Sequence, residues 1–338
     1  MKKKIFVTGG AGYIGSHTCV ELLRENHDVM VFDDLSNSSE KAIQRVQLIT
    51  NCKLNLVIGD IKNKRVLSDA MSDFQPDSVI HFAGLKAVGQ SVADPLQYYD
   101  TNVLGSVNVL QAMTNAGCFE MVFSSSATVY GDACKPPYGE FMPVAPVSPY
   151  GRTKLMVENI IKDWTASNDL NRAVILRYFN PVGAHGSGLI GEDPKNAPNN
   201  LMPVIIQAAK KRRSELAIFG SDYATRDGTC ERDYIHVEDL AQGHLKALKN
   251  IRELKKFQIL NLGSGKSTTV KELIEIFEKV NKVVVPTCIV ERRPGDVAQS
   301  LSDPTLAREL IDFKCDKTIE EMCIDTWNWI KKNPKGYQ

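Results

Sequence analysis

The chain has 338 residues, of which 43% are hydrophobic and 24% are charged; this composition suits a globular protein with a sizeable buried core and excludes disordered, collagen-like and mucin-like chains. Lys and Arg total 41 and Asp and Glu total 40, so the net charge is +1, and no basic excess points to nucleic acid as a partner. The eight cysteines contain no Cys-x-x-Cys and the six histidines no His-Glu-x-x-His, so we expect no metal site and the reduced cysteines of a cytoplasmic protein.

The first 180 residues alternate between short apolar runs and helical patterns. The first run, Ile5-Phe6-Val7, is too short for a signal peptide, and no run of about 18 apolar residues occurs in the chain, so we expect no membrane partner. Continuous apolar strands between helices are typical of a parallel sheet covered on both faces, and right-handed crossovers then give a doubly wound, Rossmann-like α/β fold. The expected strands are 5–7, 29–32, 54–58, 79–82, 121–123 and 174–176, and the expected helices are 16–24, 39–49, 64–72, 95–116 and 150–165.

The texture of the sequence changes after Asn180. Residues 181–200 hold three prolines and four glycines, which is loop composition. We therefore expect a first domain at residues 1–180 and a second, smaller α/β domain at residues 181–338, with part of 235–265 as a candidate to return to the first sheet. The expected helices of this second part are about 201–213, 238–249, 269–281, 303–310 and 318–331.

A glycine-rich turn follows the first expected strand. Gly10-Ala11-Gly12-Tyr13-Ile14-Gly15 fits G-x-G-x-x-G, and Gly9, Gly12 and Gly15 fit G-x-x-G-x-x-G. Side chains at these glycines would hold a pyrophosphate away from the helix N-terminus, whose free N–H groups and positive dipole end bind anions. The strand before the turn and the helix after it are the context that a dinucleotide site needs.

Asp33 stands at the end of the second strand, 18 residues after Gly15. A carboxylate there accepts hydrogen bonds from the 2′-hydroxyl of an adenosine ribose and repels a 2′-phosphate, so NAD is favoured over NADP. The alternative is that Asp33-Asp34 only starts a turn. Asp60 and Phe82-Ala83-Gly84 follow the third and fourth strands, at the carboxyl edge of the sheet where ligands of this fold bind.

Tyr150 and Lys154 form a Tyr-x-x-x-Lys at the start of an expected helix. Chance alone gives roughly one such pair in a chain of this composition, but this pair follows the fifth strand and its loop, and residues four apart share one helix face. A free Tyr has a pKa of about 10. A neighbouring Lys⁺ and the positive nicotinamide of NAD⁺ both favour the phenolate, so we expect a lowered pKa and a general base.

Ser124-Ser125-Ser126 ends the fifth strand. A hydroxyl there can orient a substrate hydroxyl or relay its proton to the tyrosine. Without the tyrosine and lysine, a polar strand end or a helix cap would be the better interpretation of these serines.

Several stretches carry a family resemblance. Thr8–Ser16 with Asp33, Ser124–Gly131 and Tyr150–Lys154 resemble an extended short-chain dehydrogenase/reductase. Longer stretches are similar to the UDP-glucose (UDP-galactose) 4-epimerase family, from about residue 4 to the tail at 327–337. These stretches are Gly9–Thr18, His81–Ser91, Ser124–Asp132, Arg177–His185, Asn199–Pro203 and Arg232–Val237.

This resemblance implies a reaction and roles. Tyr150 would take the proton of the sugar 4-hydroxyl while hydride leaves carbon 4 for tightly bound NAD⁺, and the resulting 4-keto sugar would turn over and regain the hydride on its other face. Lys154 would hold the nicotinamide ribose and lower the pKa of the tyrosine, and Ser126 would assist proton transfer. The family also implies a homodimer joined through the helices near 95–116 and 150–165.

The resemblance further implies two sets of contacts. Arginines suit a diphosphate because they offer fixed, positively charged forks, although residues 292–296 alone would be interpreted as a charged surface turn. The NAD set is Gly9, Gly12, Tyr13, Ile14, Gly15, Asp33, Asn37, Asp60, Ile61, Phe82, Ala83, Gly84, Lys86, Asn102, Tyr150, Lys154 and Phe179. The UDP-sugar set is Ser126, Asn180, Asn200, Leu201, Ala217, Phe219, Arg232, Arg293, Asp296 and Ser300.

Ser300 is a departure from the family members limited to unacetylated sugars, which resemble one another in carrying a bulky Tyr at the aligned position. A serine removes the ring and leaves room for a 2-N-acetyl group. We therefore expect activity on UDP-GlcNAc and UDP-GalNAc in addition to UDP-glucose and UDP-galactose.

Two alternatives stay open. A nucleotide-sugar 4,6-dehydratase shares the fold, NAD, Tyr and Lys, but such enzymes resemble one another in carrying Asp-Glu beside the catalytic Thr or Ser, where this chain has Ala127-Thr128. A non-catalytic NAD-sensing protein on the same fold is the other alternative. Such a protein has no need of the Tyr150–Lys154 pair.

Overall fold

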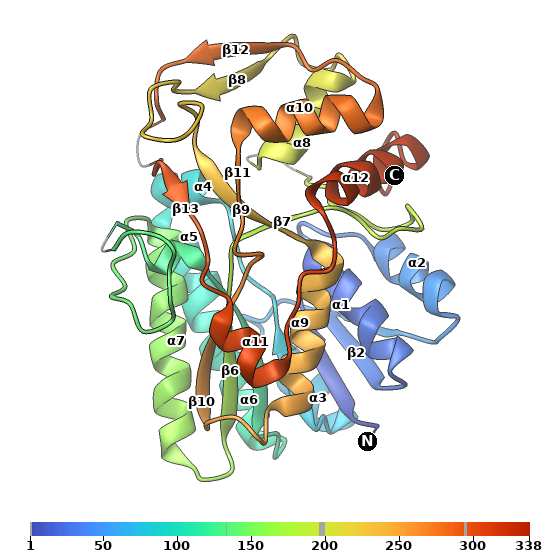
Figure 1. Cartoon of the computed structure of the whole chain (residues 1–338). Coiled ribbons are helices and arrows are strands. Elements are labelled where there is room, and N and C mark those ends of the chain that lie inside the picture. The colour runs from blue at the N-terminus through green and yellow to red at the C-terminus, as the bar shows by residue number, and fades with distance from the viewer. Residues whose placement is uncertain (1, 133, 196–199, 294–295) are drawn as a thin grey trace.

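The computed structural model describes residues 2–132, 134–195, 200–293 and 296–338. Asn199 of the family stretch 199–203, and residues 294–295 of the arginine-rich turn, lie outside the described residues. The described chain forms one large sheet with helices on both faces, and two smaller sheets with further helices beside it (Figure 1).

The large sheet has the order β10-β6-β5-β4-β1-β2-β3, and every neighbouring pair is parallel. The chain winds outward from β1 first through β2 and β3 and then through β4, β5 and β6, which confirms the doubly wound fold. Ligands bind at the carboxyl ends of the strands beside such a reversal. The strands are β1 (Lys4–Thr8), β2 (Asp28–Asp33), β3 (Asn55–Ile58), β4 (Ser78–His81), β5 (Glu120–Ser126), β6 (Arg172–Tyr178) and β10 (Phe257–Leu262).

Nine α-helices of the described residues accompany this sheet. We call this sheet with its helices the sheet region. The helices are α1 (Tyr13–Arg24), α2 (Glu40–Thr50), α3 (Lys64–Phe74), α4 (Val88–Ala93), α5 (Pro95–Tyr98), α6 (Gly105–Asn115), α7 (Pro149–Ser167), α9 (Val237–Asn250) and α11 (Thr305–Ile311), with a π-helix at Tyr99–Leu104 and a 3-10 turn at Ala127–Val129.

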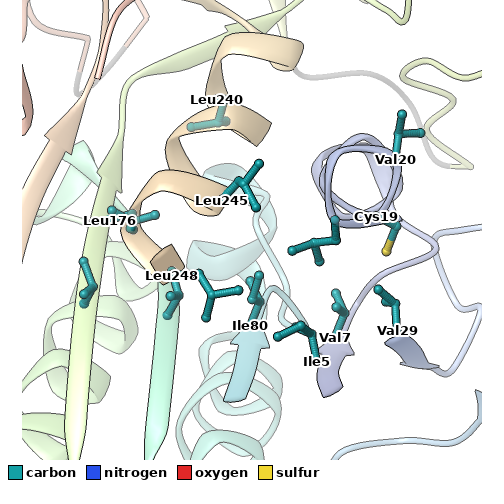
Figure 2. Close-up of a cluster of buried hydrophobic side chains, with 14 of the residues drawn as sticks. Ile5, Val7, Cys19, Val20, Val29, Ile80, Leu176, Leu240, Leu245 and Leu248 are labelled. Carbon is teal, nitrogen blue, oxygen red and sulfur yellow. The ribbon is translucent and has the colours of Figure 1, made fainter. Parts of the chain in front are cut away.

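Alternate residues of the strands face two separate cores, as the period of two in a strand requires. Ile5 and Val7 of β1 point to a core shared with α1, α2, α9 and α11, in which Val20 and Leu245 are buried (Figure 2). Phe6, between them, points to the opposite core, which it shares with α3, α6 and α7. The buried apolar runs seen in the sequence thus reflect a sheet that is covered on both faces.

Two expectations for this region were wrong in detail. The single helix expected at 95–116 consists of α5, the π-helix and α6, and α4 was not expected. The hydrophobic pattern of a helix does not distinguish an α-helical turn from the wider turn of a π-helix, since the extra residue of the wider turn shifts the apolar face only locally.

β10 lies beside β6, with Ile259 opposite Ile175.

The remaining elements form what we call the small-strand region, in the upper half of Figure 1. β9 is its centre and pairs with β7, β11 and β13, while β8 pairs with β12. A separate apolar core packs α8, α10 and α12 together. The elements are β7 (Asn180–Val182), β8 (Leu216–Phe219), β9 (Glu231–His236), β11 (Ser267–Thr269), β12 (Thr287–Val290), β13 (Gln299–Ser300), α8 (Leu201–Ala209), α10 (Val270–Asn281) and α12 (Ile319–Lys332).

Among the helices in the described part of the chain, none combines the length and the apolar character that crossing a membrane requires.

Candidate active site

The glycine-rich turn lies between β1 and α1 and is shaped by close backbone contacts. Gly9 has a φ of +69°, and a Cβ there would lie 2.6 Å from the backbone nitrogen of Ala83. A Cβ on Gly15 would lie 2.4 Å from the carbonyl oxygen of Gly9. Gly12 is the N-cap of α1 and has no side chain to cover the first N–H groups of the helix. The turn therefore presents these N–H groups and the positive end of the helix dipole, which suits a phosphate.

Asp33 lies beside this turn, at the end of β2. Its carboxylate accepts hydrogen bonds from the backbone nitrogen of Ala11 at 2.9 Å, from that of Leu35 at 3.0 Å and from Ser38 Oγ at 2.7 Å. Burial raises the pKa of Asp33, and these hydrogen bonds oppose the rise. Oδ1 accepts two of these bonds and Oδ2 only one, so the second lone pair of Oδ2 can still accept from a ribose hydroxyl.

Asn102 joins the other expected cofactor contacts to the catalytic helix. It lies in the π-helix, and its Oδ1 accepts from the backbone nitrogen of Leu85 at 2.7 Å. Its Nδ2 donates to the Leu85 carbonyl at 3.0 Å and to Thr153 Oγ1 at 3.1 Å. Thr153 in turn donates to the carbonyl of Tyr150. The loop after β4 is thus fixed to α7 through one buried amide.

The other expected NAD residues lie around these groups. Phe82 directly follows β4, Phe179 follows β6, and Asp60 and Ile61 follow β3. Tyr13 Oη donates to the Gly183 carbonyl at 2.7 Å, so the Tyr13 ring faces the small-strand region rather than the turn. The remaining residues are Ile14 in the first turn of α1, Gly84 with a φ of +156°, Lys86 paired with Glu192, and Asn37, whose Oδ1 accepts from the Lys195 backbone nitrogen.

Tyr150, Lys154 and Ser126 meet where β5 ends and α7 begins. Ser148 caps α7 by accepting from the Gly151 backbone nitrogen at 3.1 Å, and Pro149 suits the first helical position. The helix therefore begins one residue before Tyr150, and its first two turns carry Tyr150 and Lys154. Lys154 Nζ donates to the Ser124 carbonyl at 2.7 Å and lies 5.9 Å from the centroid of the Tyr150 ring.

Ser126 caps the turn that follows β5. Its Oγ accepts from the Thr128 backbone nitrogen at 3.2 Å, which caps the short 3-10 turn. The same side chain lies close enough to Tyr150 to lower the pKa of the phenol. Ser126 is therefore fixed by the turn in contact with the phenol.

The pKa of Tyr150 differs from expectation. Burial raises it to about 12, against the lowering effect of Ser126. The pKa of Lys154 is lowered to about 8 by burial, and Glu158 opposes this. The protein groups alone therefore keep the phenol neutral, because desolvation of the phenolate outweighs the lowering effect of Ser126. The expected lowering must come from a further positive charge beside the ring.

The expected substrate side contains two arginines that share one carboxylate. Arg293 Nε and Nη2 each donate to Asp296 at 3.1 Å, and Arg232 Nη2 lies 3.6 Å from Asp296 Oδ1. The guanidinium of Arg293 lies 5.1 Å from the centroid of the Phe219 ring. Two cationic forks beside an aromatic ring suit a diphosphate joined to a flat base.

The structure brings most of the remaining substrate residues to the same side. Ser300 of β13 is paired with Arg232 of β9, and Ala217 lies in β8 with Phe219. Asn180 begins β7, two residues after Tyr178, which is itself paired with Ser126. Asn200 Nδ2 donates to Glu192 Oε1 at 2.9 Å, and Leu201 begins α8.

Sequence reasoning missed Glu192. Its Oε1 accepts from Lys86 Nζ at 3.1 Å and from Asn200 Nδ2 at 2.9 Å, so it joins an expected cofactor residue to an expected substrate residue. The sequence gives no signal for this role, since Glu192 lies 106 positions from Lys86 in a loop.

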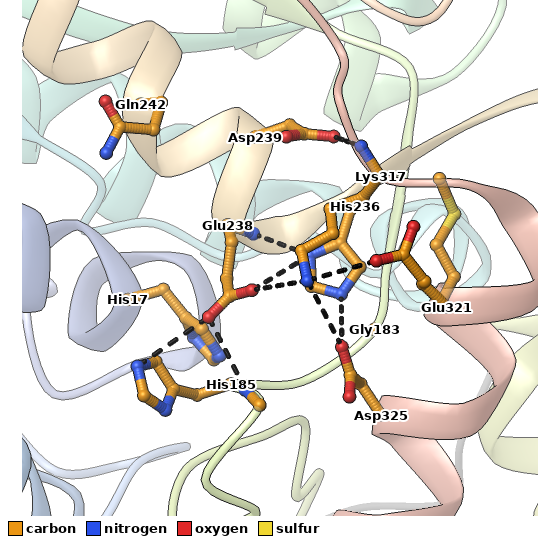
Figure 3. A network of polar contacts seen from close by, with 12 residues as sticks. His17, Gly183, His185, His236, Glu238, Asp239, Gln242, Lys317, Glu321 and Asp325 are labelled. Carbon is orange, nitrogen blue, oxygen red and sulfur yellow. Dashed lines mark hydrogen bonds and ion pairs between the residues drawn. The ribbon is translucent and has the colours of Figure 1, made fainter.

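A cluster of histidines and carboxylates lies where α9 and α12 meet the loop after β7 (Figure 3). His236, Glu238 and Asp325 are the described residues whose atoms lie close enough to hold a metal ion. His236 Nδ1 already accepts from the Glu238 backbone nitrogen at 3.0 Å, and His236 Nε2 faces Asp325 at 3.3 Å. Lys317 Nζ lies 3.7 Å from Glu238 and 3.9 Å from Asp325. Lys317 supplies a positive charge beside these two carboxylates.

The comparisons with known proteins agree with this geometry. The model of the NAD dependent epimerase/dehydratase family matches residues 5–263. A UDP-glucose 4-epimerase of Pasteurella multocida is 52% identical over 335 residues, which cover 99% of each chain. The solved UDP-glucose-4-epimerase of Stenotrophomonas maltophila, with bound NAD and formylated UDP-arabinopyranose, has a TM-score of 0.96 at 46% identity and covers 98% of this chain and 99% of its own.

A third relative has a wider described substrate range. The UDP-Glc/GlcNAc 4-epimerase of Campylobacter jejuni has a TM-score of 0.86 at 35% identity, and the match covers 97% of this chain and 99% of that chain.

Proposed function

Because this chain belongs to the NAD dependent epimerase/dehydratase family, we propose that it interconverts UDP-glucose and UDP-galactose by inverting carbon 4 of the sugar, with NAD as a tightly bound cofactor. The observation that carries the proposal is that Tyr150, Lys154 and Ser126 meet at the carboxyl edge of the large sheet. The glycine-rich turn between β1 and α1 lies at the same edge and forms a cradle for a pyrophosphate. The full-length identity to UDP-glucose 4-epimerases supports it.

The sheet region fits NAD. A pyrophosphate would lie against the N-terminus of α1, where a Cβ on Gly9 or Gly15 would close the cradle. Asp33 would accept from the adenosine ribose, and Lys154 would hold the ribose of the nicotinamide. Bound NAD⁺ would accept the hydride of carbon 4 and return it, so the reaction has no net oxidation.

Tyr150 would act as the general base and then as the general acid. Its oxygen takes the proton of the 4-hydroxyl and returns it to the 4-keto sugar after the sugar has turned over. Ser126 is held by the 3-10 turn in contact with the phenol, so it can orient the substrate hydroxyl. Since burial raises the pKa of Tyr150 to about 12, the phenol ionises only when a second positive charge joins Lys154.

We assign the UDP-sugar to the small-strand region after residue 180 and NAD to the sheet region. Arg232 and Arg293 would bind the diphosphate, and Ala217 and Phe219 of β8 would contact the base. Asp296 keeps both arginines paired and oriented toward one point. Asn180, Asn200, Leu201 and Ser300 would complete the sugar end.

We further propose activity on UDP-GlcNAc and UDP-GalNAc. Ser300 is half-buried in β13 beside Arg232 and has a small side chain where a ring would fill the space. The likeness to a UDP-Glc/GlcNAc 4-epimerase supports this. Ser300→Tyr should abolish turnover of the acetylated pair and spare that of UDP-galactose; wild type without acetylated turnover would contradict the proposal.

The two alternatives fit the site less well. A dehydratase needs an acid and a base beside the catalytic hydroxyl, and Thr128 here only donates to Ser126 Oγ at 3.0 Å. A product that keeps its 6-hydroxyl would exclude the dehydratase. An NAD-sensing protein has no use for the fixed lysine and serine at Tyr150.

We propose a homodimer formed through the helices between residues 88 and 167. Val92 and Leu96 are 65% and 77% exposed on α4 and α5, and Met156 is 43% exposed on α7. An apolar patch on neighbouring helices is typical of an isologous contact.

The eight cysteines are free thiols in the described chain, which supports our proposal that the protein works in the cytoplasm.

The deciding experiment is incubation of the purified protein with each of the four UDP-sugars, followed by separation of the epimers. We expect UDP-glucose and UDP-galactose to reach the same equilibrium mixture from either side, and NAD to be released on denaturation. Recovery of only the starting UDP-sugar from every incubation would overturn the proposal.

A further inference from the structure

Asp233 is a buried carboxylate in the middle of β9, outside both sets of expected contacts. Its side chain has no exposed surface, and five hydrogen bonds converge on it. Oδ1 accepts from the backbone nitrogen and the hydroxyl of Ser264, at 2.8 and 2.6 Å. Oδ2 accepts from the backbone nitrogen of Gly265 at 3.0 Å and from the nitrogen and hydroxyl of Ser302, at 3.1 and 2.5 Å. Such a set of donors holds a charged carboxylate in one orientation.

One end of this set controls the segment that carries Ser300. Ser302 lies two residues beyond Ser300, so the carboxylate fixes the segment just after its pairing with Arg232. Tyr138 holds the same segment from the other side, since its nitrogen donates to the Leu301 carbonyl at 2.8 Å. Ser302 also packs closely against Gly263, because a Cβ on Gly263 would lie 2.3 Å from Ser302 Oγ.

The main chain of Asp233 fixes a second expected substrate residue. Asn180 Nδ2 donates to the Asp233 carbonyl at 2.9 Å, and Asp233 directly follows Arg232. Three residues expected to contact the UDP-sugar, Asn180, Arg232 and Ser300, are therefore positioned by one residue that belongs to neither set.

We propose that Asp233 is a positioning residue for the sugar end of the substrate site, acting through Ser302 on Ser300 and through its carbonyl on Asn180. This inference rests on the proposed function. It predicts that weakening the contact between Asp233 and Ser302 changes the affinity for the sugar moiety and leaves the affinity for UDP and the NAD content unchanged.

The test compares two variants that each remove one hydroxyl donor from the same carboxylate. Ser302→Ala removes the donor on the Ser300 side, and Ser264→Ala removes the donor in the turn before β11. Asp233→Asn is less useful, because its amide would add a donor where five already converge. Calorimetric titration of the purified NAD-containing protein gives the affinity for UDP and, with UDP-glucose, an apparent affinity for the UDP-sugar, which is interconverted between its two epimers but not consumed.

We expect Ser302→Ala to weaken UDP-glucose binding by about threefold to tenfold, the net size of one ordinary hydrogen bond, while UDP binding changes by less than about twofold. Ser264→Ala should leave both affinities within the same limit. Equal effects of the two variants on the ratio of UDP-glucose to UDP affinity, or no effect of either, would overturn the proposal and leave Asp233 a tie for stability.

Wild-type protein that binds UDP-glucose without epimerising it would overturn the proposed function, while the titrations would still decide the role of Asp233. Wild-type protein that binds neither UDP nor UDP-glucose would overturn both.

Discussion

The sheet region and the small-strand region build their halves of the site by different means. In the sheet region, backbone geometry shapes the site. Gly9 and Gly15 allow the backbone segments of the turn to approach one another closely, and the N-terminus of α1 offers N–H groups that no side chain caps. In the small-strand region, short strands are joined by buried or half-buried carboxylates such as Asp233 and Asp296.

This difference follows from the length of the strands. The strands of the parallel sheet have four to seven residues, and their ladders of hydrogen bonds place the strand ends accurately, whereas β7 and β11 have three residues and β13 has only two. A two-residue strand needs side-chain contacts to hold its position. Substitutions in the sheet region should therefore act through size and shape, and those in the small-strand region through charge.

The largest effect is expected for Tyr150→Phe, at the junction between the two regions. Removing the phenolic oxygen should lower kcat by about 10³-fold, because general acid–base catalysis is lost. Steady-state kinetics would measure this, and the NAD released on denaturation should equal that of wild type. A rate within tenfold of wild type would mean that another group takes the proton.

Gly9→Ala should show that shape decides in the sheet region. The new Cβ would lie 2.6 Å from the Ala83 nitrogen at a φ of +69°, so we expect the free energy of unfolding to fall by about 2–4 kcal/mol and NAD to be lost. Urea unfolding and NAD content would measure both effects.

Gly89→Ala is the matched control for this variant. Gly89 lies in α4, and a Cβ added there would have nothing within 4 Å. The free energy of unfolding should therefore rise by about 0.5–1 kcal/mol in this variant. A Gly9→Ala protein that keeps its NAD would contradict the account of the cradle.

His81 makes the sheet region sensitive to acid. Burial, with a smaller effect of Lys154, lowers its pKa from 6.5 to about 3, so the unfolded chain binds a proton that the folded chain refuses. The contribution of the neutral His81 to the free energy of unfolding is therefore fully present above pH 6.5 and is lost as the pH falls toward 3.

Compared with His81→Gln, wild type should lose about 1.4 kcal/mol more per pH unit between pH 6 and 4. Urea unfolding at several pH values measures both slopes. Parallel slopes would mean that His81 is charged in the folded protein.

Arg293→Gln tests the role of charge in the small-strand region. Losing one charged fork from the diphosphate should raise KM for UDP-galactose about 10- to 30-fold. Arg292→Gln is the neighbouring control, because Arg292 donates to Asp222 at 2.8 Å instead of to Asp296. Equal KM values for the two variants would remove Arg293 from the site.

The smallest effect is expected at the start of α12, far from the chemistry. Thr318 and Glu321 form a capping box there, so Thr318→Ala should cost about 1 kcal/mol of stability. Thermal unfolding would measure the loss, and kcat and KM should stay at wild-type values.

The sequence predicted most of the sheet region, because each feature there is local. The glycine turn, Asp33 and the Tyr150–Lys154 pair are separated from their strands or helices by a few residues, and the apolar runs mark the strands. The division of 95–116 into α5, a π-helix and α6 was missed because these segments share one helical pattern.

Most of the small-strand region could be assigned only through the family resemblance. Ser300 and Arg232 lie 68 positions apart, and Glu192 joins Lys86 to Asn200 across the two regions. The pattern of residues around Asp233 gives no sign of its five donors, which come from segments 31 to 69 positions away.

The position of β10 has a consequence for the newly made chain. Its parallel ladder covers the edge of β6, yet Leu262 leaves the ribosome 84 residues after Tyr178, a delay of roughly 5–15 s at usual rates of protein synthesis. During that interval the nascent Rossmann sheet has a bare strand edge, the kind of surface that recruits chaperones or foreign strands. Slow translation between these two strands would therefore increase aggregation of the new chain and leave the activity of the folded protein unchanged.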